Sequence, residues 1–265
     1  MSTLESIFKN VRQASRELVT LSDDKIKEVL KDVAAVALAT TKDILEANQK
    51  DLDLMDKNDP KYDRLMLTEQ RIKDIASDII NISDLNSPVG EIITKKTLDN
   101  GLDLSKVRVP MGVIGIIYEA RPNVSFDVFS LCFKTQNACI LKGSSDAEFS
   151  NTAIVNLIRE VLIKHSINSH VITLLPTDRS ATTEMLNAIE YVDIIIPRGS
   201  QNLINYVRDN AKVPTIETGA GIVHTYFDES ADLAKGKQII CNAKTRRVSV
   251  CNALDCLLIH KKRLS

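Results

Sequence analysis

The sequence predicts an α/β protein with a parallel sheet, and three observations carry that prediction. From residue 112 onward, short continuous apolar runs alternate with amphipathic stretches, which is typical of parallel strands covered by helices on both faces. Before that point, residues 1–85 show helical periodicity, and residues 89–109 switch to a strand-like pattern around an Asn-Gly pair. With 265 residues, 44% of them hydrophobic, the chain can bury the core of one large or two modest domains.

The N-terminal region is predicted to consist of packing helices. Ile26, Leu30, Val33 and Ala37 recur at helical spacing on one face of a long segment, and Ser22 is placed to cap its start. A further helix is expected over 69–82. The charged positions on the opposite faces are interpreted as solvated surface.

A hairpin is predicted where two strand-like runs, 92–98 and 102–109, flank Asn100-Gly101. An Asn-Gly pair readily adopts the positive-φ backbone of a two-residue hairpin turn. Because a two-stranded hairpin is only marginally stable alone, it should pair with further strands, in this chain or in another subunit.

After the hairpin, the predicted elements alternate. Strands are expected over 112–118, 138–142, 171–175, 192–196, 214–217 and 223–227, and helices over 126–135, 149–165, 182–188 and 201–210. Parallel sheets bind ligands outside the carboxyl ends of their strands, so the loops at those ends form the candidate site. These loops, 118–123, 142–145, 197–200 and 217–221, are rich in small and basic residues, which suits a phosphate-bearing ligand. Neither G-x-G-x-x-G nor a Walker motif is present.

Composition argues against several functional classes. Lys and Arg number 34 against 35 Asp and Glu, and aromatic residues make up only 4%, so no nucleic-acid partner is expected. No apolar run approaches the length that a bilayer requires, and the N-terminus lacks the apolar core of a signal peptide, so no membrane partner is expected. The five cysteines show no CxxC pairing and the four histidines are scattered, which predicts a reducing cytoplasm and no metal site.

One cysteine stands in a distinctive setting. Cys251 lies in a polar loop that also contains Lys244, Arg246 and Arg247, between a helical pattern and an apolar run. Nearby cations favour the thiolate, which can attack an activated acyl carbon. The alternative is a small buried hydrophobe, as most free cysteines are, and the local sequence leaves both interpretations open. The other four cysteines are interpreted as packing residues: Cys132, Cys139, Cys241 and Cys256.

Several segments together resemble one enzyme family. They are 63–68 (DRLMLT), 110–123 (PMGVIGIIYEARPN), 196–200 (IPRGS), 217–219 (ETG) with Gly221 and His224, and 242–253 (NAKTRRVSVCNA). In this order they resemble the γ-glutamyl phosphate reductases, also called glutamate-5-semialdehyde dehydrogenases, over nearly the whole chain. The resemblance implies an aldehyde-dehydrogenase-like fold and an NADPH-dependent, cytoplasmic enzyme of proline biosynthesis that reduces a small-molecule substrate, γ-glutamyl phosphate. It also implies that the hairpin serves oligomerisation in a homo-oligomer.

The resemblance assigns roles to individual residues. Cys251 is expected to be the nucleophile, and Asn123 and the Cys251 main-chain N–H to donate to the oxyanion, with a simple turn residue as the alternative for Asn123. Arg246 and Arg247 are candidate clamps for a substrate phosphate or carboxylate, with solvated surface as the alternative. The expected cofactor-binding residues lie at strand ends: Lys142, Gly143, Ser144, Pro197, Arg198, Gly199, Ser200 and Glu217. Of these, residues 142–144 are expected to meet the adenosine ribose and the 2′-phosphate.

Members of this family continue past the position of Ser265, so the resemblance implies a C-terminally truncated chain. Residues 1–244 are predicted to form the cofactor-binding domain, and residues 245–265 the start of an incomplete catalytic domain that carries the nucleophile. Two other functions stay open. One is a non-catalytic nucleotide-binding fragment, and the other is a different cysteine-dependent acylating aldehyde dehydrogenase, such as a CoA-acylating enzyme.

Overall fold

The computed structural model describes residues 3–59, 61–217, 221–246, 248 and 251–264. The chain forms two compact units, Met1–Glu217 and Thr218–Ser265. The compact units thus meet after Glu217. The boundary predicted after residue 244 separates a cofactor-binding from a catalytic function instead, and it stays a prediction. No helix in the described ranges combines the length and the apolar character needed to cross a membrane.

The first unit begins with the predicted packing helices. The Ser22 hydroxyl accepts a hydrogen bond from the Lys25 main-chain N–H at 3.2 Å, so it caps α2 (Asp23–Ala39) as expected. The predicted apolar face of α2 is fully buried in the main core. The other helices of this region are α1 (Thr3–Leu18), α3 (Thr41–Asp53), α4 (Tyr62–Leu65) and α5 (Glu69–Asp84).

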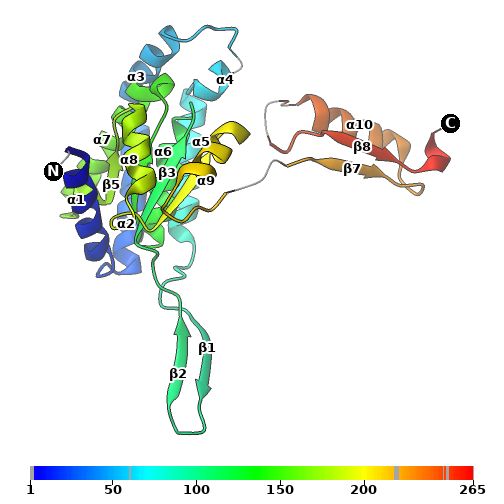
Figure 1. Cartoon of the computed structure of the whole chain (residues 1–265). Helices are drawn as coiled ribbons and strands as arrows, with labels where there is room; N and C mark the ends of the chain where they lie inside the picture. The colour runs from blue at the N-terminus through cyan, green and yellow to red at the C-terminus, as the bar shows by residue number, and fades with distance from the viewer. Residues whose placement is uncertain (1–2, 60, 218–220, 247, 249–250, 265) are drawn as a thin grey trace. The chain divides into compact units, whose positions relative to one another are not determined.

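The predicted hairpin is confirmed. β1 (Ile92–Thr97) and β2 (Asp103–Val107) pair antiparallel, and Gly101 in the turn has φ +83°. Every residue of both strands is exposed, including Ile92, Ile93 and Leu104. Figure 1 shows the hairpin extending away from the sheet of the first unit, with no further strand beside it.

A four-stranded parallel sheet forms the centre of the first unit, in the order β5-β4-β3-β6. Its strands are β3 (Val113–Tyr118), β4 (Ala138–Lys142), β5 (Ile172–Leu174) and β6 (Ile194–Arg198). The helices between and after them are α6 (Asn123–Lys134), α7 (Glu148–Lys164), α8 (Arg179–Asn187) and α9 (Gln201–Asn210), with short 3₁₀ turns at Ser145–Ala147 and Ser169–Val171. All six residues of β3 are buried, as expected for the central strand of a covered sheet.

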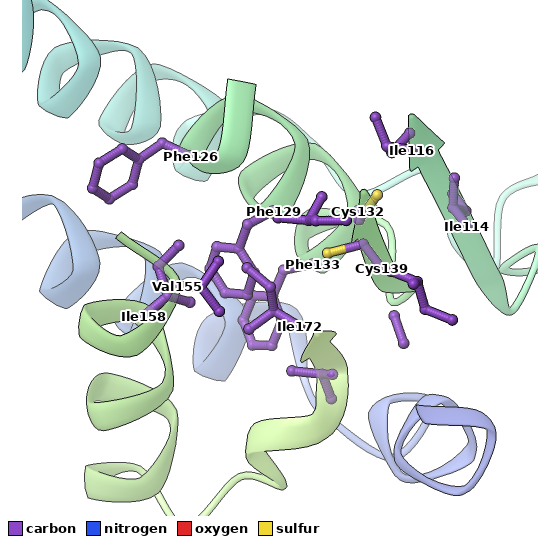
Figure 2. Close-up of a cluster of buried hydrophobic side chains, with 14 of the residues drawn as sticks. Ile114, Ile116, Phe126, Phe129, Cys132, Phe133, Cys139, Val155, Ile158 and Ile172 are labelled. Atoms are coloured by element: carbon purple, nitrogen blue, oxygen red, sulfur yellow. The ribbon is translucent and has the colours of Figure 1, made fainter. Parts of the chain in front are cut away.

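The core lies where α6 and α7 pack against this sheet (Figure 2). Phe129 and Phe133 of α6 stack with ring centroids 5.1 Å apart. Cys132 and Cys139 are buried in the same cluster, which confirms them as packing residues. A hydrogen bond with Cys132, together with burial, raises the pKa of the Cys139 thiol well above its usual value.

Two of the predicted strands behave differently from expectation. The strand predicted over 214–217 is wrong in extent, because Thr215 makes only a single parallel bridge to Ile195. Ile195 makes the two hydrogen bonds of this bridge with the Pro214 carbonyl and the Ile216 N–H. Pro214 has no N–H with which to extend the ladder further. The strand predicted over 223–227 does form, as β7 (His224–Phe227), but it is not part of the four-stranded sheet.

The second unit contains a small parallel sheet. β7 pairs with β8 (Cys256–Ile259), from His224 opposite Cys256 to Phe227 opposite Ile259. Between them lie α10 (Leu233–Thr245) and the segment that carries Cys251, and a 3₁₀ turn at Lys261–Arg263 follows β8. No residue of α10 is buried, so this unit has little core of its own within the described chain.

Candidate active site

The ends of three parallel strands bring predicted site residues to one edge of the sheet. In the register of the sheet, Lys142 of β4 lies opposite Ile117 of β3, and Arg198 of β6 lies opposite Tyr118. The chain runs from β3 to β4 on one side of the sheet, whereas β6 pairs on the other side of β3. This change of direction is the topological switch point at which open α/β sheets bind ligands.

Asn123 opens α6 directly after β3. Its Nδ2 donates to the Asp127 Oδ2 at 3.0 Å, one helical turn further on. Burial raises the pKa of the Asp127 carboxyl, while the bond from Asn123 and the charge of Arg198 act in the opposite direction. The Asn123 side-chain amide is thus held at the switch point, one residue after Pro122.

Lys142 is the last residue of β4 and is only 6% exposed. Its ammonium donates to two main-chain carbonyls, Gly143 O at 3.2 Å and Thr177 O at 3.0 Å. Burial lowers the pKa of Lys142, and the charges of Asp178 and Glu148 partly offset this. The ammonium thus joins the loop after β4 to the loop after β5.

The loop after β4 is tightly packed on one side and open on the other. A Cβ on Gly143 would lie 2.4 Å from the Asn151 Nδ2, so this position accepts only glycine without rearrangement. Ser144 Oγ accepts from the Asp146 N–H at 3.2 Å and caps the 3₁₀ turn. A pocket of about 320 Å³ borders the loop, lined among others by Gly143, Glu148 and Thr177.

Beneath this loop lies a buried chain of hydrogen bonds that sequence reasoning missed. The Tyr118 hydroxyl bonds Ser125 Oγ at 2.8 Å, and Ser125 Oγ donates to the Asn151 Oδ1 at 3.1 Å. Burial raises the pKa of Tyr118. This relay connects β3, α6 and α7 under the expected cofactor loop, and no local sequence signal marks it.

At the end of β6, the predicted residues surround another carboxylate. Glu119 Oε1 accepts from Ser200 Oγ at 2.6 Å, and Glu119 Oε2 accepts from the Ser200 N–H at 3.1 Å. A Cβ on Gly199 would lie 2.7 Å from the Glu119 Cδ, so the glycine makes room for this side chain. The loop after Pro197 and Arg198 therefore binds an internal carboxylate, where the sequence suggested a phosphate.

Glu217 lies apart from these contacts. It is exposed at the end of the first unit and forms a 3.9 Å ion pair with Arg208 of α9. The structure gives it no contact with residues 142–144 or 197–200 among the hydrogen bonds and ion pairs of the described chain.

In the second unit, Cys251 is exposed between α10 and β8, so it is not the buried hydrophobe of the alternative interpretation. Lys244 Nζ donates to the Leu254 carbonyl at 2.8 Å and thereby closes the segment that carries Cys251. Arg246 is exposed at the end of α10, and Arg247 lies outside the described residues.

The remaining cysteines of this unit correct one expectation. Cys241 is exposed on α10, so it is not a packing residue within the described chain, because α10 has no buried face. Cys256, half-buried in β8, is the more protected of the two. Among the residues that the structure describes, no group of His, Cys, Asp and Glu is placed to hold a metal ion.

Comparison with known proteins gives consistent matches. A family model described as the aldehyde dehydrogenase family matches residues 4–265. The γ-glutamyl phosphate reductase of Bacteroides thetaiotaomicron is 62% identical over 263 residues, which are 99% of this chain and 63% of that protein. The γ-glutamyl phosphate reductase of Chlorobium phaeobacteroides is 61% identical over 98% of this chain and 63% of its own length.

A solved structure agrees with these matches. The crystal structure of γ-glutamyl phosphate reductase from Thermotoga maritima superposes with a TM-score of 0.88 at 41% identity, covering 98% of this chain and 64% of that one. The chain thus spans about 63% of the length of the curated relatives that it matches.

Proposed function

The chain belongs to the aldehyde dehydrogenase family, and we propose that it carries the cofactor-binding part and the nucleophile of an NADPH-dependent γ-glutamyl phosphate reductase. The observation that carries this proposal is the 62% identity to such a reductase over 99% of the chain. That stretch includes Asn123 at the switch point and the exposed Cys251.

The proposed reaction begins at Cys251. Its thiolate forms a bond to the γ-carbonyl carbon of γ-glutamyl phosphate, and phosphate leaves with the electron pair of the broken C–O bond. NADPH, when bound, supplies the hydride that converts the resulting thioester to the semialdehyde and returns the thiolate. Negative charge develops on the carbonyl oxygen in both steps, and the Asn123 amide and the Cys251 N–H are the proposed donors to it.

The residues at the strand ends fit a nucleotide with a 2′-phosphate. Within the described chain the Lys142 ammonium donates to two neutral carbonyl oxygens, so a third N–H remains for an anion. Ser144, two residues further along the same loop, adds a hydroxyl. We assign the 2′-phosphate to Lys142, Gly143 and Ser144, another part of the cofactor to the segment Pro197, Arg198, Gly199 and Ser200, and Glu217 to the cofactor loop.

The rest of the proposal concerns substrate and assembly. Arg246 and Arg247 would clamp the phosphate or carboxylate of the substrate. The exposed hairpin around Gly101 would pair with strands of another subunit in a homo-oligomer. By function, residues 1–244 would bind the cofactor and residues 245–265 would begin the catalytic domain, in a cytoplasmic enzyme of proline biosynthesis.

The test is reduction of γ-glutamyl phosphate by a full-length protein carrying this sequence, with and without Cys251→Ser. The variant should lose nearly all turnover, because a hydroxyl is a far weaker nucleophile than a thiolate at neutral pH. Trapping of the thioester by mass spectrometry should place it on Cys251, and Cys241→Ser is the matched control on an exposed cysteine. Full activity of Cys251→Ser, or an adduct on another cysteine, would refute the proposal.

Two further arms separate the alternatives. Turnover of acyl-CoA in place of the acyl phosphate would indicate a CoA-acylating enzyme. Binding of NADPH without any turnover in the full-length protein would indicate a nucleotide-binding protein without this activity.

A further inference from the structure

In the hydrogen bond between Asn123 and Asp127, the Asn123 amide donates and the Asp127 carboxylate accepts. Nδ2 of Asn123 lies 3.0 Å from Oδ2 of Asp127. An ionised carboxylate only accepts hydrogen bonds, so the amide nitrogen of Asn123 must face it and the amide oxygen must point elsewhere. An asparagine without such a neighbour can rotate its amide and present either group.

Asp127 places a half-buried carboxylate where burial destabilises its charged form, so a contribution to folding stability does not explain why a carboxylate stands there. Both residues are half-buried on α6, at the edge of the sheet where Arg198 also lies. Burial disfavours the ionised carboxyl, as its raised pKa records, and the charge of Asp78 adds to this effect. By comparison, the same i, i+4 arrangement on α5, from Gln70 to Asp74 at 2.9 Å, lies on the exposed surface and involves no such penalty.

We infer that Asp127 is a positioning residue that orients the Asn123 side-chain amide, so that its second N–H is presented to the reacting carbonyl oxygen. The inference rests on the proposed function of Asn123 as an oxyanion donor. Asp127 itself touches neither substrate nor cofactor in this scheme and acts only through Asn123. Its carboxylate supplies the orienting interaction, because both of its oxygens accept hydrogen bonds and neither donates.

The orienting role of Asp127 can be tested by substitution. Asp127→Asn offers both an acceptor oxygen and a donor NH₂ group, so it can face either group of the Asn123 amide and fixes its orientation only in part, whereas Asp127→Ala removes the partner. Loss of a whole oxyanion donor lowers kcat by about a hundredfold to a thousandfold. Misorientation of a donor that is still present should cost less, so we expect Asp127→Ala to lower kcat by about tenfold, and Asp127→Asn to stay within about threefold of wild type.

The decisive experiment is a double-mutant cycle in the full-length protein, with kcat and the KM for NADPH measured for Asn123→Ala, Asp127→Ala and the double variant. If Asp127 acts through Asn123, the double variant should have the kcat of Asn123→Ala alone, because groups that act as a unit are not additive. The KM for NADPH should stay within about twofold throughout. Asp74→Ala, which breaks the matched pair on α5, should leave kcat unchanged.

A second measurement reads the orientation directly in the 265-residue chain. The side-chain ¹⁵N–¹H₂ signals of Asn123, assigned by their loss in Asn123→Ala, should report one protected, hydrogen-bonded N–H in wild type. In Asp127→Ala that N–H should lose its protection. An unchanged Asn123 signal in Asp127→Ala would overturn the inference. This measurement does not depend on turnover, so it stays decisive if Asp127→Ala loses activity through poor folding of the full-length protein.

The outcomes distinguish this inference from the function on which it rests. If Asn123→Ala keeps wild-type kcat, the oxyanion role of Asn123 is wrong and the inference falls with it. If Asn123→Ala is impaired but Asp127→Ala is not, or if the two losses multiply in the double variant, only the positioning role is wrong.

Discussion

Asp51 holds the start of α7, and removing its carboxylate should strongly destabilise the first unit. Asp51 lies near the end of α3 and is only 2% exposed. Its Oδ1 accepts from the Phe149 N–H at 3.0 Å, and its Oδ2 accepts from the Ser150 N–H at 2.8 Å and the Ser150 hydroxyl at 2.5 Å. These N–H groups belong to the first turn of α7, which has no partners for them within the helix.

The size of the effect follows from these three bonds. Each bond to a charged group contributes about 1.5–3 kcal/mol, but water and rearrangement recover part of the loss when the acceptor is removed. Breaking a buried charged interaction by deleting one partner costs about 3–5 kcal/mol, so we take about 4 kcal/mol for Asp51→Ala. In a unit of this size, 1 kcal/mol lowers Tm by roughly 2–4 °C, which predicts a drop of roughly 8–16 °C.

The assay is thermal unfolding of the 265-residue chain followed by far-ultraviolet circular dichroism. Asp53→Ala is the matched control, because Asp53 lies on the same helix but is exposed, where it accepts a bond from Gln49. Its Tm should fall by no more than about 2 °C. Asp51→Asn should lie between the two, since it keeps one acceptor but turns an NH₂ group toward donors. A loss below about 1 kcal/mol in Asp51→Ala would refute the idea that this carboxylate anchors α7.

Three further predictions follow from the same structure. Phe133→Ala, which opens a cavity in the stacked core of Figure 2, should cost about 3–5 kcal/mol in urea unfolding, whereas Leu131→Ala on the exposed face of α6 should cost about 0.5 kcal/mol. Burial raises the pKa of Asp127, so the ionised carboxylate destabilises the folded state at pH 7. Asp127→Asn should therefore raise Tm at pH 7. This gain in Tm should vanish below about pH 4, where the wild-type carboxyl is protonated in both the folded and the unfolded protein. Lys142→Met should change Tm by only a few degrees, because relief of the buried ammonium offsets the loss of its hydrogen bonds to Gly143 and Thr177. It should weaken NADPH binding about tenfold or more in calorimetry, and unchanged NADPH affinity would remove Lys142 from the cofactor site.

Local pattern was sufficient for most of the secondary structure. The Asn100-Gly101 turn, the Ser22 cap and the four strands of the main sheet are where their neighbours in sequence predict them. The reason is physical: turn chemistry, capping and hydrophobic periodicity act over a few residues. The prediction failed at Thr215, where the neighbouring Pro214 limits pairing and the strand reduces to one bridge.

The site residues show a sharper division. The sequence by itself determined that Lys142 ends a parallel strand, that Arg198 lies at the end of another and that Cys251 lies in a polar segment, since these depend on pattern and on family resemblance; that β6 extends to Arg198 itself came from the structure. The side-chain partners were decided only by the tertiary structure. Asp51 meets α7 across 99 positions of sequence, and Glu119 meets Ser200 across 81.

Such partners depend on which distant segments pack together, and no local rule encodes that choice. For the same reason the sequence did not show that Gly199 also makes room for the Glu119 side chain. The Asn123–Asp127 pair lies between these cases. Its i, i+4 spacing is visible in the sequence, but only the tertiary structure shows that the carboxylate is desolvated and exposed to the charge of Arg198.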